Sequence, residues 1–149
     1  MYNRPTDPCR AFLDSYREAK FEVRRLGEKL QQLTARVTKM TATLSDEPKG
    51  GGADRNQLLA AFADATASVQ KKYCAAIKRQ QDVENFIDSV GGDLNRIILR
   101  LRYVELMRWP DIQKKMEEAN LYYTDRHLFR LHGEALNAAR REWERRTSC

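Results

Sequence analysis

The sequence ILRLRYVELMRWPDI, residues 98–112, is followed after a spacer by TDRHLFRLHGEAL, residues 124–136. Apolar residues recur around both stretches at the three- and four-residue intervals of one face of an α-helix. On the first helix the predicted inward residues are Leu94, Ile97, Ile98, Leu101 and Val104. On the last helix they are Leu128, Leu131, Ala135, Leu136 and Ala139. The pattern predicts helices that pack on one another on either side of the spacer.

Capping residues mark the ends of these helices. Asp93 is a suitable N-cap for the first one, and Trp109-Pro110 suits the first turn of a short second one. Asn120 favours the left-handed conformation that closes a helix, and Thr124 offers a hydroxyl to cap the next. We expect the last helix to run from Asp125 to about Arg146. Two helices are therefore expected to meet across a brief turn.

Two apolar stripes organise residues 1–90 with the spacing of a heptad seam, and the second has one extra four-residue step from Val69 to Tyr73. The first stripe contains Phe12, Tyr16, Ala19, Val23, Leu26, Leu30, Leu33, Val37, Met40 and Leu44. The second contains Leu58, Phe62, Ala65, Val69, Tyr73, Ala76, Gln80, Val83, Ile87 and Val90. A Gly/Pro loop at residues 45–53 separates them, and Gly91-Gly92 ends the second. Because a short connection makes antiparallel neighbours the default, the stripes predict a helical hairpin.

The stripes have two interpretations. Most of their residues are expected to be ordinary core. In the second interpretation, one stripe also joins two copies of the chain or docks on a partner, because a two-helix hairpin is too thin to bury all of it and is marginal alone. Ala65, Ala76 and Gln80 weaken the second stripe. We therefore expect support from the C-terminal domain or from a second copy, and we predict a homodimer.

The charge balance favours an acidic partner. The chain has 149 residues, with 27 Lys and Arg against 21 Asp and Glu, for a net charge of +6. After Gly91-Gly92 there are 12 basic and 9 acidic residues, and ten of those cations are Arg. Arginine suits bidentate contact with phosphate or guanine. Nucleic acid is therefore a more natural partner than an acidic small substrate.

Cysteine usage and hydropathy bear on the compartment. Cys9, Cys74 and Cys149 are odd in number and far apart, without a Cys-x-x-Cys pair or a Cys/His cluster. They suggest neither a disulfide framework nor a zinc site, and a reducing cytosol fits them best. No apolar run approaches the length of about 18 residues that a transmembrane helix needs. We expect no signal peptide, no membrane anchor, no metal and no cofactor.

The start of the last helix carries the residues that suggest a function. Arg126 and Arg130 lie four apart on one face, where either could bind guanine O6 and N7 or a phosphate, and Phe129 could contact a thymine methyl. Thr124 and the helix N-terminus suit a phosphate. The predicted DNA-binding residues are Thr124, Asp125, Arg126, His127, Phe129, Arg130, Lys114 and Lys115, with His132 as a further outward residue.

The segment from Leu94 to Leu136 resembles region four of bacterial sigma factors, which recognises the upstream promoter element. The matching groups are ILRLRY at 98–103, WPDI at 109–112, and Thr124, Leu128, Ala135 and Leu136. The whole chain is similar in plan to small phage and prophage proteins, late-transcription activators of the ArpU and RinA type. These have a helical N-terminal half and a sigma-like helix-turn-helix, and the run from Leu128 to Leu136 carries this second likeness most.

The resemblance implies transcription regulation from a phage genome through DNA binding, with or without contact to RNA polymerase. The base-reading positions of sigma-like recognition helices fall on Asp125, Arg126, Phe129 and Arg130. The chain departs from the pattern between Glu117 and Tyr123, where extra residues lengthen the turn. We expect Tyr122 and Tyr123 to pack beneath the last helix and compensate. Arg108 stands where relatives have a capping Ser.

Three further features are interpreted structurally. Gly133 costs a helix about 1 kcal/mol relative to Ala, which suggests close packing against a neighbouring helix. His127 and His132 are five apart and do not share a helix face, as zinc ligands would, so we expect a polar or groove-facing pair. Arg140, Arg141, Arg145 and Arg146 form either a solvated tail or a contact to the DNA backbone.

The sequence thus predicts an all-α protein with two domains. Residues 1–90 form a long antiparallel, coiled-coil-like hairpin with helices at about 9–44 and 54–90, and residues 93–149 form a sigma region-four-like helix-turn-helix. We expect a transcription regulator of late genes, not an enzyme, that binds double-stranded DNA in the cytoplasm of a bacterial host. RNA polymerase is a further expected partner. The alternative is an interaction protein that binds polymerase or another partner without sequence-specific DNA binding, and a phage packaging adaptor is a third hypothesis.

Overall fold

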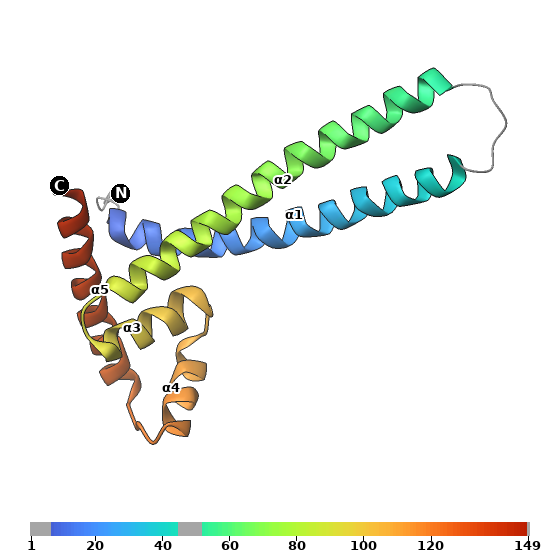
Figure 1. Ribbon diagram of the computed structural model, residues 1–149. Coiled ribbons are helices and arrows are strands. Elements are labelled where there is room, and N and C mark those ends of the chain that lie inside the picture. The colour runs from blue at the N-terminus through green and yellow to red at the C-terminus, as the bar shows by residue number, and fades with distance from the viewer. Residues whose placement is uncertain (1–6, 45–51, 149) are drawn as a thin grey trace, which may run out of the picture. The chain divides into compact units, whose positions relative to one another are not determined.

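The computed structural model describes residues 7–44 and 52–148, and this part of the chain is all-helical, without a β-strand. Its elements are α1 (Pro8–Leu44), α2 (Gly52–Ser89), α3 (Asp93–Leu99), the π-helical segment η1 (Arg100–Val104), α4 (Trp109–Glu118) and α5 (Asp125–Thr147), as Figure 1 shows. The all-α prediction is confirmed. Most of the predicted Gly/Pro loop, residues 45–51, lies outside the described residues.

The chain divides into two compact units that cut across the predicted domain boundary. The first unit joins Met1–Glu18 to Arg79–Cys149, and the second is Ala19–Lys78. The predicted boundary at Gly91-Gly92 falls inside the first unit, because the first turns of α1 and the last turns of α2 belong to the same hydrophobic core as α3, α4 and α5.

The core of the first unit draws on every helix. Its fully buried side chains include Leu13 of α1, Phe86 and Ile87 of α2, Ile98 and Leu99 of α3, Ile112 of α4 and Leu128 of α5. Phe86 meets the ring of Phe12 edge-on at 5.3 Å between centroids, and Trp143 of α5 lies 5.9 Å from Phe86. Aromatic pairs in this geometry contribute about 0.5–1.5 kcal/mol beyond area burial. The first turns of α1 and the last turns of α2 therefore pack against α5 through these rings.

The start of α3 differs from the prediction. The N-cap is Gly92, with a φ of 92° that L side chains rarely adopt, and no side chain caps the helix there. Asp93 is the first helical residue instead, where its carboxylate suits the positive end of the helix dipole and pairs with Arg96. The glycine thus determines where α3 begins.

The buried residues of α3 and η1 do not lie on the single face that the sequence predicted. Ile98 and Leu99 are both fully buried although they point about 100° apart around a helix. The predicted inward residue Ile97 is 46% exposed, while Leu94 and Val104 are half-buried and Leu101 is buried. The helix is therefore covered on more than one side. It widens at η1, where the N–H of Glu105 donates to the carbonyl of Arg100 at 2.9 Å.

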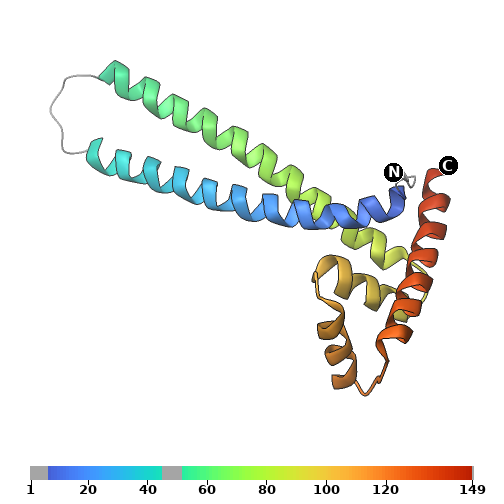
Figure 2. The same ribbon diagram turned by 180° about the vertical axis from the view of Figure 1, so that it is seen from behind.

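The second unit is held by a strip of apolar contacts between α1 and α2, which lie side by side in Figures 1 and 2. Its buried residues are Leu26 and Leu33 of α1 with Val69 and Ala76 of α2, flanked by Val23, Leu30, Phe62 and Tyr73. All of these belong to the predicted stripes. The first stripe is confirmed as the packed face of α1 wherever its side chains are described.

The second stripe drifts near the beginning of α2. The predicted residues Leu58 and Ala65 are exposed, while their neighbours Leu59 and Thr66 are half-buried. A straight helix turns by about 20° per heptad relative to a strict seven-residue repeat, so a long heptad stripe gradually leaves the interface. None of the helices in the described ranges combines the length and apolar character that crossing a bilayer requires.

Candidate nucleic-acid interface

The turn between α4 and α5 begins with a well-formed helix end. Asn120 has a φ of 63°, as the sequence predicted for the residue that closes α4. Its N–H donates to the carbonyl of Glu117 at 2.9 Å, and the N–H of Leu121 donates to that of Met116 at 2.9 Å. This pair of bonds is the Schellman arrangement, which satisfies the last carbonyls of the helix. The start of α4 has no side-chain cap at Arg108, whose Nε instead lies 3.3 Å from Asp111.

The start of α5 is capped as predicted. Thr124 has extended backbone angles, and its hydroxyl accepts a hydrogen bond from the N–H of His127 at 3.2 Å. The carbonyl of Tyr123 accepts a hydrogen bond from Nε2 of Gln113 in α4 at 2.7 Å. The lengthened turn is thus tied to both helices, and the first turn of α5 has a defined direction.

The two tyrosines of the turn behave differently. The ring of Tyr123 packs against the core and meets the His127 ring edge-on at 4.7 Å between centroids. The predicted packing beneath α5 is therefore right for Tyr123. It is wrong for Tyr122, whose side chain is 74% exposed. The extra residues need only one aromatic anchor because Gln113 holds the backbone of the turn directly.

The inward and outward faces of α5 largely follow the prediction. All five predicted inward residues are buried, together with Ala138. Among the predicted DNA-binding residues, Thr124, Asp125, Arg126, Phe129, Arg130, Lys114 and Lys115 are exposed, and His127 is half-buried. Those of the first two turns of α5 lie together at one end of the helix, while the two lysines lie on α4.

His132 corrects the prediction because it faces inward. Its Nε2 lies 2.9 Å from the hydroxyl oxygen of Tyr103, and Trp109 meets the imidazole edge-on at 4.8 Å. Burial lowers the pKa of His132 to about 4, with the nearby cations Arg10, Arg102 and Arg140 acting in the same direction. The five-residue step from His127 turns His132 through about 140°, from the margin of the surface into the core. His132 is half-buried against Tyr103 and Trp109, so it does not form a DNA-facing pair with His127.

The Phe129 ring is exposed to solvent but packs against another aromatic ring. It is 54% exposed, yet one edge packs against Trp109 at 5.3 Å between centroids, with the ring planes 73° apart. The guanidinium of Arg102 lies 5.0 Å from the centroid of the same Trp109 ring. Arg102 is fixed in turn by donating to the carbonyl of Met107 at 2.9 Å. No sequence pattern links Arg102 and Trp109 to this surface, since both residues precede α5 and lie on other elements.

The cations of this surface are only weakly engaged. Arg130 lies 4.0 Å from Glu134 and donates from its guanidinium to Nε2 of His127 at 2.8 Å, and Lys115 lies 3.4 Å from Glu105. Within residues 7–44 and 52–148, Arg126 makes no ion pair. Exposed pairs of this kind contribute at most about 1 kcal/mol, so a phosphate could replace the carboxylates at little cost.

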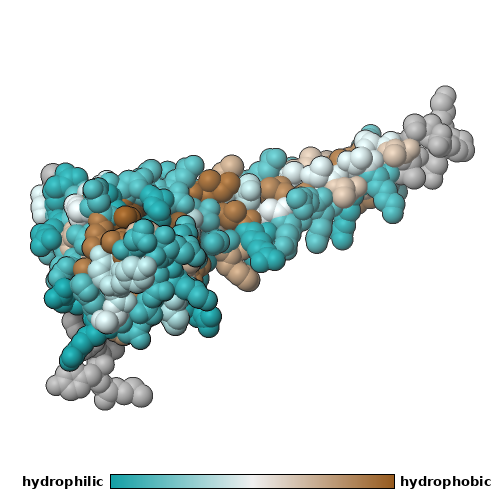
Figure 3. Space-filling model, turned by 90° about the horizontal axis from the view of Figure 1, so that it is seen from below, coloured by the Kyte–Doolittle hydropathy of each residue, from teal (hydrophilic) through white to brown (hydrophobic). Residues whose placement is uncertain are grey.

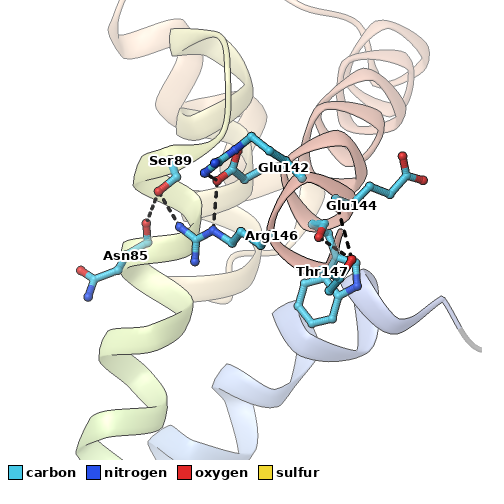
Figure 4. A network of polar contacts seen from close by, with 8 residues as sticks. Asn85, Ser89, Glu142, Glu144, Arg146 and Thr147 are labelled. Atoms are coloured by element: carbon cyan, nitrogen blue, oxygen red, sulfur yellow. Dashed lines mark hydrogen bonds and ion pairs between the residues drawn. The ribbon is translucent and has the colours of Figure 1, made fainter. Parts of the chain in front are cut away.

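Three of the arginines near the C-terminus make ion pairs. Arg140 pairs with Asp7 at 2.7 Å, and Arg145 and Arg146 both pair with Glu142 at 2.7 and 3.0 Å. Figure 4 shows Arg146 reaching from α5 to Ser89 of α2, to which it donates at 2.7 Å. The hydrogen bonds that Arg145 and Arg146 donate to Glu142 lower the pKa of its carboxyl group to about 2. Arg145 and Arg146 are nevertheless exposed, as a solvated tail would be, while Arg140 is half-buried; Arg141 alone of the four is left exposed without an ion pair in the described chain.

The remaining reactive groups form no second site in the described ranges. No three His, Cys, Asp or Glu side chains come together there as metal ligands would. Burial raises the pKa of the Cys9 thiol to about 11, and Cys74 is exposed.

The face of the molecule in Figure 3 is largely hydrophilic, with hydrophobic residues in separate groups.

Comparison with known proteins adds no assignment. No protein-family model, no curated protein and no solved structure matches the chain.

Proposed function

We propose that this chain is a DNA-binding transcription regulator of phage or prophage origin. In this proposal α4, the turn and α5 act as a sigma region-four-like helix-turn-helix that regulates late genes in the cytoplasm of a bacterial host. One observation carries the proposal. Arg126, Phe129 and Arg130 are exposed together on the first two turns of α5, while Thr124 caps that helix and the opposite side is buried.

The chemistry of this surface suits the major groove of duplex DNA. A helix of this diameter fits the groove, and Arg is the side chain that most often reads guanine there. Arg126 makes no ion pair in the described chain, and Arg130 is held only by exposed contacts. Both guanidinium groups are thus available to base edges or phosphates. Asp125 is proposed to favour a cytosine amino group over an acceptor.

The surroundings of α5 supply groups for the DNA backbone. Thr124 stands at the helix N-terminus, where the dipole favours an anion. Lys114 and Lys115 are exposed on α4. We assign these three residues and His127 to positioning the helix rather than to reading sequence, because phosphate contacts carry no direct sequence information.

The helices α1 and α2 are proposed to form an antiparallel, coiled-coil-like hairpin that joins two copies of the chain. The strip of Leu26, Leu33, Val69 and Ala76 supports their pairing within the second unit. Phe21 and Leu58 remain exposed there and have apolar surface to offer a second copy. A dimer would let two recognition helices bind two half-sites, which raises affinity without any new contact per subunit.

Selection from a library of random DNA duplexes tests the proposed function with the full chain. The expected result is enrichment of one sequence, bound more tightly than its scrambled version at physiological salt. Arg126→Ala should reduce the preference, while the substitution Arg36→Ala, at an exposed arginine of α1, should leave it intact. If no sequence is enriched, and RNA polymerase is instead recovered on the immobilised chain from bacterial extract, the chain is an interaction protein and the proposal fails.

A further inference from the structure

The DNA-facing surface contains one group whose exposure electrostatics does not explain. Phe129 lies three residues after Arg126 and directly before Arg130, and 54% of it is exposed to solvent. An exposed phenyl ring contributes nothing to phosphate binding. Its neighbours along the outward side are charged or polar, so it is an isolated apolar group within a charged surface.

The ring is also held in place from below. The Phe129 and Trp109 rings meet edge-on, and Trp109 also contacts the imidazole of His132 at 4.8 Å and the guanidinium of Arg102 at 5.0 Å. A ring supported in this way loses little further freedom when it makes a contact. Preorganisation of this kind favours a specific contact because the entropy cost of ordering the side chain is already met by folding.

The floor of the major groove offers few apolar groups. Guanine, adenine and unmethylated cytosine present hydrogen-bond donors and acceptors there, whereas thymine adds a C5-methyl. Methylated cytosine carries the same group at the same ring position. An exposed phenyl ring that packs on Trp109 and shares the first two turns of α5 with two arginines therefore matches a pyrimidine methyl that neighbours guanines or phosphates.

We propose that Phe129 is a specificity-determining residue that reads the C5-methyl group of a pyrimidine, with thymine as its source in ordinary DNA. This inference rests on the proposed DNA binding and names the base chemistry that the same surface recognises. Trp109 and Arg102 are positioning residues in it, because they act through the orientation of the Phe129 ring.

Replacing thymine by deoxyuridine tests the inference, since the exchange removes only the methyl group. In the duplex selected from the random library, each thymine is replaced singly and binding of the full chain is measured. One or two positions should weaken binding about three- to fivefold, the effect of burying one methyl group. Phe129→Ala should bind the thymine and deoxyuridine duplexes equally. Phe129→Leu should keep part of the discrimination.

Tyr122→Ala is the matched control, because Tyr122 is an exposed aromatic side chain of the turn that lacks the Trp109 support. This variant should discriminate thymine from deoxyuridine as the parent does. A parallel selection with 5-methylcytosine in place of cytosine separates the two methyl sources. If only methylcytosine duplexes bind more tightly than their unmethylated forms, the methyl inference holds with that source.

The two failures are distinguishable. A selected duplex whose affinity is unchanged by every deoxyuridine replacement, and by cytosine methylation, overturns the role of Phe129 and leaves DNA binding standing. Equal thymine discrimination by the parent and by Phe129→Ala does the same. The absence of any selected duplex overturns both the inference and the proposed function.

Discussion

The imidazole of His132 stacks on the ring of Tyr103, with 5.8 Å between centroids, and its Nε2 lies 2.9 Å from the tyrosine hydroxyl. The unprotonated nitrogen of a neutral imidazole can accept a hydrogen bond from the tyrosine hydroxyl, whereas an imidazolium has no acceptor. Burial lowers the pKa of His132 from 6.5 to about 4. Between about pH 6.5 and pH 4, His132 is therefore protonated in the unfolded chain but not in the folded chain.

This relationship predicts a loss of stability in mild acid. The free energy of unfolding should fall as the pH drops from about 6.5 to about 4, by up to roughly 3 kcal/mol, and this contribution should then level off. The carboxylate of Glu142, with its pKa near 2, loses its contribution only below about pH 4.5, in a separate window. Urea unfolding at a series of pH values measures the effect.

The histidine pair supplies the control. His132→Gln should flatten the dependence between pH 6.5 and 4 even if it lowers stability at pH 7, because glutamine does not titrate there. His127→Gln should retain the dependence, since His127 lies at the edge of the surface. An equal acid response from the parent chain and His132→Gln would show that another group is responsible.

Replacing Gly133 by alanine should stabilise the protein. The sequence suggested that this glycine permits close helix packing, but an added Cβ would meet nothing within 4 Å. Only the helix cost of glycine remains, so Gly133→Ala should raise the free energy of unfolding by about 1 kcal/mol. Denaturant titration at pH 7 measures it. A lower midpoint would mean that a neighbour does occupy this space.

The cap of α5 is predicted to contribute to stability independently of DNA. Thr124→Ala removes the oxygen that accepts from the N–H of His127, and it should cost about 1 kcal/mol. Thr124→Ser keeps this oxygen and should be nearly neutral. Thermal unfolding followed by circular dichroism compares the two. Equal midpoints for the serine and alanine variants would contradict the capping role.

The proposed dimer makes a prediction about α1. Light scattering and sedimentation of the full chain should give the mass of two copies at micromolar concentration. Phe21→Ser should weaken the association by about tenfold or more if this exposed ring is buried between copies. Gln31→Ser, at an exposed polar position on the same helix, is the control. A monomeric parent chain would rule out the dimer.

Local features of the fold could be predicted from the sequence. Asn120, Thr124 and the inward residues of α5 are governed by backbone preference, capping and helical periodicity, which act over a few neighbouring residues. Each of these was predicted correctly. The exposure of Arg126, Phe129 and Arg130 could be predicted too, because residues that do not lie on the inward face of a helix lie on its outward face.

Features that depend on distant partners could not be predicted. Leu99 is buried and His132 is half-buried by helices other than their own, and a single apolar face does not describe a helix that is covered on several sides. The division of the chain depends on where α1 and α2 enter the core of the first unit. The ion pairs of Glu142 with Arg145 and Arg146 were also not predicted, although they are local. Their spacings of three and four residues on one helix are those of typical ion pairs.

The central claim is that α5 reads duplex DNA through Arg126 and Arg130, and a salt titration of binding to the selected duplex tests it most directly. The logarithm of affinity should fall linearly with the logarithm of salt concentration. At fixed salt, Arg126→Ala and Arg130→Ala should each cost about 1–3 kcal/mol on the selected duplex and much less on a scrambled one, with Arg36→Ala unchanged. Binding of both variants to both duplexes with the parent's affinity would contradict the assignment of α5 as the recognition helix.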